Sequence, residues 1–247
     1  AYIGYWGDHQ IIYLLKLLEL SNEYHPDKIK ELLTRDIFTY ANVPYRIKPY
    51  SEIVSNPHDT IDFNYDLQDK IESRVEDLGN DGKLILTDTE KIYQVNLTEK
   101  LLVPILAKLS NFIPEAGIWM NTQRPEWNDA NNALVGYGVS MVTLYYLRRH
   151  LAFCSDLFDS LDKESIKISR EVAEWFNSTF ATFNNFKNLL ENTISDKNRK
   201  AILDELEIAA ENYRNKIYQN GFTTNQTEVK TSDIVEFFKI ALSFIDH

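Results

Sequence analysis

The residues best able to do chemistry lie together at 124–138, in the run Arg-Pro-Glu-Trp-Asn-Asp-Ala-Asn-Asn-Ala-Leu-Val-Gly-Tyr-Gly. Glu126 and Asp129 place two carboxylates three residues apart around Trp127, and two amides follow directly. A core does not accept polar groups at this density, so we expect a loop at the mouth of the apolar segment that follows. Carboxylates and amides hydrogen-bond hydroxyl groups, an indole ring can stack on a sugar face, and a protonated carboxyl can donate to a glycosidic oxygen. This acidic loop (residues 124–138) therefore predicts a carbohydrate site.

Each side chain of the acidic loop has a functional interpretation and a structural one. Asp129 can act as a general acid if burial beside Trp127 and the charge of Glu126 keep it protonated, or it can cap the next helix. Glu126 suits a hydrogen bond to the loop backbone or to a sugar hydroxyl, and Trp127 suits a stacking platform or a wall of the core. Arg124 can hold a carboxylate or a phosphate with its planar fork, or pair with Glu126. The predicted site has Asp129 as catalytic residue, with Arg124, Glu126 and Trp127 binding substrate.

A second polar group, Trp6, Asp8 and His9, comes just before a strongly apolar segment. Asp8 is a candidate substrate-binding residue or the N-cap of the helix that follows, and Trp6 and His9 either bind substrate or pack. A metal site built from Asp8, His9, Glu126 and Asp129 would match no standard ligand spacing, so we predict no metal.

The composition limits the class of partner. A net charge of −11 and a pI near 5.0 argue against a nucleic acid, whose backbone requires clustered Lys and Arg. The sequence has no run of about 18 apolar residues and no signal peptide, so we expect no membrane partner and a cytoplasmic location. The single cysteine, Cys154, lies among apolar residues and is predicted to be a buried thiol. The abrupt start, without Met, predicts that the remainder of a longer chain is a partner.

Apolar periodicity predicts mainly helices. The segment 9–21 is apolar around nearly its whole circumference, which is typical of an internal helix. Residues 36–64, which contain three prolines, are predicted to form a long ordered loop. The other elements predicted before the acidic loop are helices at 26–33 and 65–78, a short β-hairpin over 83–95, and a helix at 98–112 kinked or broken near Pro104.

After the acidic loop, a long helix is predicted over about 131–158. Further helices with polar faces are predicted at 163–191, 195–219 and 231–246, with a polar linker at 221–230. The charges between Lys197 and Glu207 alternate as they do on a solvated surface. Helices paired by loops, some of them apolar all round, indicate layered α-hairpins, as in a toroid or a solenoid.

The acidic loop also carries a resemblance. Pro125-Glu126-Trp127-Asn128-Asp129-Ala130-Asn131-Asn132, followed by Gly136-Tyr137-Gly138 and an apolar helix, resembles the inverting glycoside phosphorylases, which include cellobiose and chitobiose phosphorylase and cyclic glucan relatives. Trp6-Gly7-Asp8-His9-Gln10 is similar to the start of one helix in that family. The resemblance covers roughly residues 1–152 and implies an (α/α)6 toroid with Asp129 as general acid.

The chain departs from the family pattern in three respects. Glu126 stands in place of an aspartate, Ala130 stands in place of a glycine, and the family's phosphate-binding His, Thr and Gly cannot be placed in residues 153–247. The resemblance implies no cofactor, with inorganic phosphate as a candidate co-substrate.

The sequence thus predicts a carbohydrate-active enzyme that cleaves a glycosidic bond of a disaccharide or oligosaccharide with inversion, by phosphorolysis or hydrolysis. Residues 1–160 would form the catalytic part of the toroid, and residues 161–247 further toroid helices or a helical insertion. We expect Asp8 and Asp129 to open onto one cavity. The alternative is a helical-array protein that binds partners without catalysis.

Overall fold

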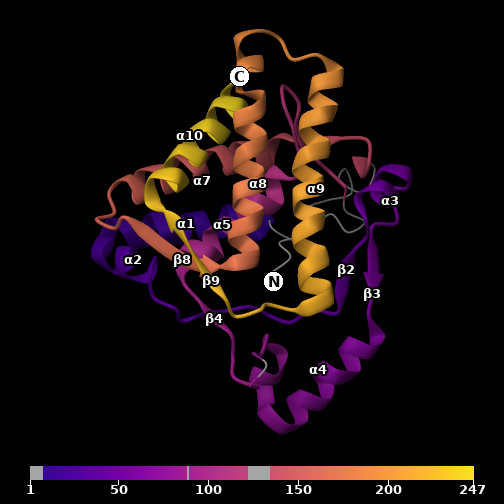
Figure 1. The fold of residues 1–247 in the computed structure, drawn as a ribbon, viewed down its shortest axis with the longest axis vertical. Coiled ribbons are helices and arrows are strands. Elements are labelled where there is room, and N and C mark those ends of the chain that lie inside the picture. Colours follow the sequence, from indigo (N-terminus) through magenta and orange to yellow (C-terminus); the bar gives the residue numbers. More distant parts are fainter. Residues whose placement is uncertain (1–7, 88, 122–133) are drawn as a thin grey trace.

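The computed structural model describes residues 8–87, 89–121 and 134–247, with side chains from residue 11 onward. Most of these residues lie in α-helices, and small antiparallel sheets join them (Figure 1), which confirms the mainly-α prediction. No helix in these ranges combines the length and the apolar character that a membrane crossing requires.

The first helix, α1 (Asp8–Tyr24), buries only one of its two apolar faces. Ile11, Leu15 and Leu18 are buried, whereas the second face is at least half exposed at Tyr13, Leu17, Leu20 and Tyr24. Among the described residues, α1 is therefore not the internal helix that its composition predicts. The next helix, α2 (Pro26–Leu32), begins as predicted with Pro26 in its first turn.

The predicted loop at 36–64 contains short elements: β1 (Phe38–Thr39), β2 (Tyr45–Ile47), α3 (Tyr50–Ser55) and β3 (Ile61–Phe63). Strands β2 and β3 pair antiparallel. Helix α4 (Tyr65–Leu78) follows with the predicted bounds, because Asn64 accepts a hydrogen bond from the Leu67 N–H at 3.0 Å and Gly79 adopts a positive φ of 63°.

The predicted hairpin over 83–95 is confirmed only at its centre. After a 3₁₀ turn, η1 (Gly79–Lys83), Leu86 bridges Ile92, and the Tyr93 N–H donates to the Ile85 carbonyl at 2.9 Å. The outer residues pair elsewhere, because Leu84 bridges Ala41 and β4 (Gln94–Val95) pairs with β1. The hairpin is thus part of a larger antiparallel arrangement that includes the chain near residue 40.

The next helix, α5 (Leu97–Leu109), starts at Asn96, whose side chain accepts from the Glu99 N–H at 3.1 Å. It continues through Pro104, where a kink or break is predicted. Strands β5 (Phe112–Ile113), β6 (Gly117–Trp119) and β7 (Val139–Ser140) then form one antiparallel sheet.

The helix predicted over about 131–158 is interrupted by strand β7, and its first residues, 131–133, lie outside the described residues. Helix α7 (Met141–Asp159) starts after β7, because residues 139–140 pair with β6 and Ser140 then caps the helix by accepting from the Thr143 N–H at 3.2 Å.

The remaining elements are β8 (Ser165–Ser169), α8 (Arg170–Phe186), η2 (Lys187–Glu191), α9 (Asp196–Asn220), β9 (Gln226–Lys230) and α10 (Thr231–Asp246). Helices α9 and α10 confirm the predictions at 195–219 and 231–246. The prediction of helix over 163–191 is wrong at both ends, since β8 precedes α8 and a 3₁₀ turn follows it. The predicted linker at 221–230 is also partly wrong, because β9 pairs with β8 along its whole length.

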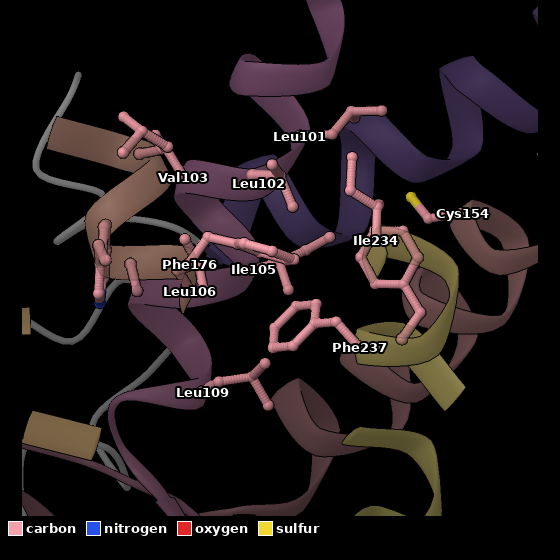
Figure 2. Packing of buried hydrophobic residues seen from close by; sticks show 14 of the residues in the cluster. Leu101, Leu102, Val103, Ile105, Leu106, Leu109, Cys154, Phe176, Ile234 and Phe237 are labelled. Carbon is pink, nitrogen blue, oxygen red and sulfur yellow. The ribbon is translucent and has the colours of Figure 1, made fainter. Parts of the chain in front are cut away.

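One hydrophobic cluster joins these helices, with α5 at its centre. Figure 2 shows Leu102, Ile105 and Leu109 of α5 facing Ile234 and Phe237 of α10, with Phe176 of α8 and Cys154 of α7 in the same cluster. The predicted burial of Cys154 is confirmed, and burial raises the pKa of its thiol well above the usual range. Figure 1 shows α8 and α9 side by side, while α4 extends away from this body.

A buried carboxylate fixes α5 against the start of α8. Glu99 accepts hydrogen bonds from the Ser169 N–H at 2.7 Å, from the Ser169 hydroxyl and from the Tyr40 hydroxyl at 3.1 Å. Tyr93 extends the network to Ser169 at 2.7 Å. Burial raises the pKa of Glu99, although the hydrogen bonds from Ser169 and Tyr40 oppose that shift.

Candidate functional site at the base of the acidic loop

The side chains predicted to do chemistry lie outside the described residues. This holds for the substrate-binding and catalytic candidates Trp6, Arg124, Glu126, Trp127 and Asp129, and for the side chains of Asp8 and His9. The backbone of Asp8 and His9 forms the first residues of α1, which agrees with a helix start at this point. The shared cavity of Asp8 and Asp129 stays a prediction.

The structure does describe the base of the acidic loop. The Met120 N–H donates to the Gly138 carbonyl at 3.0 Å, and the Gly136 N–H donates to the Met120 carbonyl at 2.6 Å. The indole N–H of Trp119 also donates to the Gly136 carbonyl at 3.1 Å. These bonds continue the pairing of β6 with β7, so the chain before the acidic loop and the last residues of the loop are held together.

A close backbone approach fixes the end of the loop against the α3–β3 connection. Gly136 has a φ of 82°, and a Cβ atom at this position would lie 2.3 Å from the Cγ of Pro57. Only glycine combines this φ with so little space. The neighbouring Tyr137 ring lies 5.6 Å from the His58 ring, so the same connection lies beside both residues.

The other side of the base is held by α9. The Asn121 amide donates to the carboxylate of Glu207 at 3.3 Å and also to the side chain of Asn111. The guanidinium of Arg214 reaches the second oxygen of Glu207 at 3.4 Å, and both charged residues are buried. Burial raises the pKa of Glu207, and the charge of Arg214 acts against that shift.

Glu207 belongs to a polar stripe along α9, defined here as Asp204, Glu207, Glu211, Arg214 and Tyr218. The Tyr50 hydroxyl donates to Asp204 at 2.6 Å, and the Tyr50 N–H donates to Glu211 at 3.0 Å. The Tyr218 hydroxyl accepts from the Ile47 N–H at 2.9 Å. The stripe therefore fixes both the proline-rich segment around residue 50 and the chain entering the acidic loop.

The sequence interpretation missed Glu207, which it assigned to a solvated surface. That prediction is wrong because Arg214 and Asn121 supply the partners that a buried carboxylate requires. The spacing gave no signal, since polar residues that recur every three or four positions on one helical face are equally typical of a solvated face. The stripe lies beside the apolar face of α9, where Leu206, Ala210 and Tyr213 are buried as well.

The described arrangement holds the chain on both sides of residues 122–133. It supplies buried, hydrogen-bonded supports of the kind that orient a site without touching its ligand.

Among the described residues, no group of three or more His, Cys, Asp or Glu side chains is placed to hold a metal ion. The chain matches no protein-family model and no curated protein sequence.

Proposed function

We propose that this chain is the acid-bearing part of a carbohydrate-active enzyme that cleaves a glycosidic bond with inversion of configuration. The observation that carries the proposal is the pair Glu126 and Asp129 around Trp127 in a loop of the sequence. Support comes from the base of that loop, where the β6–β7 pairing and the Asn121–Glu207 bond hold the adjoining chain. A general acid must be positioned to within a fraction of an ångström, so firmly held flanking residues suit this role.

In the proposed reaction, Asp129 protonates the glycosidic oxygen while a nucleophile attacks the anomeric carbon from the opposite face. The bond between the anomeric carbon and that oxygen breaks, and the leaving sugar departs as an alcohol. Phosphate is already anionic and needs no base, whereas water needs one. Trp127 would stack on a sugar ring, and Arg124, Glu126, Asp8, His9 and Trp6 would bind hydroxyl groups or the phosphate.

The proposal includes an (α/α)6 toroid, completed by the remainder of a longer chain, and a cytoplasmic location. Antiparallel packing of long helices, as in α8 with α9, is compatible with such an array. The exposed apolar face of α1 is what a helix inside a larger array would carry.

That same face favours a second candidate, a helical-array protein that binds partners without catalysis. Tyr13, Leu17, Leu20 and Tyr24 form a stripe of the kind that docks against another helix. This candidate gives no reason for two carboxylates and two amides around Trp127 in the sequence, so we rank it second.

Product analysis separates the possibilities. The intact protein is incubated with a panel of disaccharides, with and without inorganic phosphate, and the first-formed anomer is read by proton NMR. Phosphorolysis yields a sugar phosphate only when phosphate is present, and hydrolysis yields free sugar in both cases. An inverted anomer supports the proposal in either case. Retained configuration, or no cleavage of any member of the panel, contradicts it and favours the binding protein.

A further inference from the structure

A separate cleft of about 410 Å³ lies between α4 and the C-terminal end of α9. Figure 1 shows these two elements in its lower part. Among the described residues, its wall contains three cationic residues, Arg46, Lys70 and Arg74, and one acidic residue, Asp66. In a chain with a net charge of −11, this local excess of positive charge is unusual. Such an excess attracts anions.

Arg74 provides the second observation. Its Nε and Nη2 atoms are buried and have no hydrogen-bond partner among the described residues. The same edge of Arg149 donates to both carboxylate oxygens of Glu19, at 2.7 and 2.6 Å, and that of Arg148 holds Asp246 in the same way. A guanidinium edge buried without an acceptor is unfavourable, and Arg74 lacks the partner that the exposed Arg148 and Arg149 have.

The cleft's own side chains do not supply this partner. Asp66 lies two helical turns before Arg74 on α4, and no ion pair joins them in the described structure. Arg46 is already placed by Tyr218, whose carbonyl lies 3.4 Å from Nη2 and whose ring centroid lies 5.4 Å from the guanidinium carbon. Arg46 thus forms a fixed wall, and Arg74 remains the group able to take a ligand.

The rest of the wall indicates what the ligand carries besides its charge. Asn42 and Asn220 contribute neutral amides, which donate to and accept from hydroxyl groups. Arg74 is half-buried, so rotation about its outer side-chain bonds can turn the Nε and Nη2 edge into the cleft. The first residue of α9 in the cleft wall is Ile217, ten positions after Glu207. At a helical rise of 1.5 Å per residue this is about 15 Å, so the cleft is separate from the base of the acidic loop.

We propose that this cleft binds a small polyhydroxylated ligand through a phosphoryl or carboxylate group, with Arg74 as the bidentate anchor and Lys70 as a second cation. The inference is independent of the proposed glycosidic cleavage.

Isothermal titration of the whole chain with glucose 6-phosphate, glucuronate and glucose tests it. We expect at least one charged sugar to bind with a Kd below about 1 mM and glucose to bind at least tenfold more weakly. Tighter binding of glucose 6-phosphate assigns a phosphoryl ligand, and tighter binding of glucuronate assigns a carboxylate. Arg74→Met should raise the Kd of the charged sugar at least tenfold. Arg74→Lys should have a Kd between those of Arg74→Met and the unaltered chain, since lysine keeps the charge but lacks the planar fork.

Arg35→Met is the matched control, because it removes an exposed arginine that pairs with Glu31 away from the cleft. It should leave binding unchanged. If circular dichroism shows that the Arg74 variants do not fold, Lys70→Met on the same wall takes their place and should also weaken binding. The proposal is overturned if neither charged sugar binds, if glucose binds as tightly as both, or if a folded cleft variant binds like the unaltered chain.

Discussion

The side-chain amide of Asn121 donates a 3.3 Å hydrogen bond to the carboxylate of Glu207, which lies 86 positions later on α9. Asn121 comes three residues before the acidic loop, and Glu207 is only 1 % exposed. A long, well-packed helix therefore holds the chain that enters the loop.

Removing Glu207 tests the energetic importance of this support. Glu207→Met leaves the buried charge of Arg214 without a partner, so we expect the free energy of unfolding to fall by about 3–5 kcal/mol. The double variant Glu207→Met with Arg214→Met removes both charges and should recover most of that loss. Urea denaturation measures both, with Glu205→Met on the exposed side of α9 as control. A single variant as stable as the control would show that the pair contributes little.

Gly136→Ala tests the other side of the base. The new methyl group would meet Pro57 at 2.3 Å on a backbone with φ of 82°, so strain and collision combine. Gly79→Ala is the matched control, because Gly79 has a φ of 63° with nothing within 4 Å. We expect about 1–2 kcal/mol of destabilisation at Gly79 and a further 1–3 kcal/mol at Gly136. Equal losses in thermal unfolding would mean that Pro57 moves freely.

His150 predicts a loss of stability in mild acid. Its Nδ1 lies 3.2 Å from the Ile11 carbonyl of α1, and burial lowers its pKa from 6.5 to about 4. Because the unfolded chain binds this proton more readily, stability present above pH 6.5 is lost as the pH falls toward 4, by about 3 kcal/mol. His150→Asn keeps a donor near Ile11 but does not titrate, so its stability should fall less over this range. If the stability of the two proteins falls equally between pH 6.5 and 4, His150 is not the group responsible for the loss.

Glu99 predicts the opposite dependence of folding stability on pH. Burial raises its pKa above the usual 4.5, so the folded state holds the proton more tightly than the unfolded chain. The resulting stability is full below pH 4.5 and is lost as the pH rises through the raised pKa. Glu99→Gln removes this dependence of stability on pH. At neutral pH it also replaces one of the two acceptor oxygens that serve Ser169 and Tyr40 with an NH2 donor, at a cost of about 1–3 kcal/mol. Unfolding midpoints at pH 4.5 and 7 measure both effects, with the exposed Glu205→Gln as control.

The sequence predicted the elements whose signals are local. Pro26 marks the start of α2, and Gly79 marks the end of α4, each through its own backbone preference. Strands β8 and β9 were missed because residues 226–230 are polar and become a strand only by pairing with a segment about sixty residues earlier. The short alternation Ser-Ile-Lys-Ile-Ser was the available signal for β8, with Ile166 and Ile168 both buried.

In the candidate site, too, local features could be predicted from the sequence and long-range contacts could not. The chemistry of the acidic loop is local and was read from residue types, but its support by Asn121 and Glu207 depends on how α9 packs. Charge alternation along α9 cannot distinguish a solvated face from a buried polar stripe without its partners. The predicted roles of Trp6, Asp8, His9, Arg124, Glu126, Trp127 and Asp129 stay predictions.

The most direct test is the rate of Asp129→Asn in the intact protein on two substrates that differ only in leaving group. Asparagine keeps the size of the side chain and can still cap a helix, but it has no proton to transfer. We predict that turnover of a disaccharide, a poor leaving group, falls about 100-fold or more, while an activated aryl glycoside of the same sugar is much less affected. Unchanged turnover of the disaccharide would contradict the assignment of Asp129 as general acid.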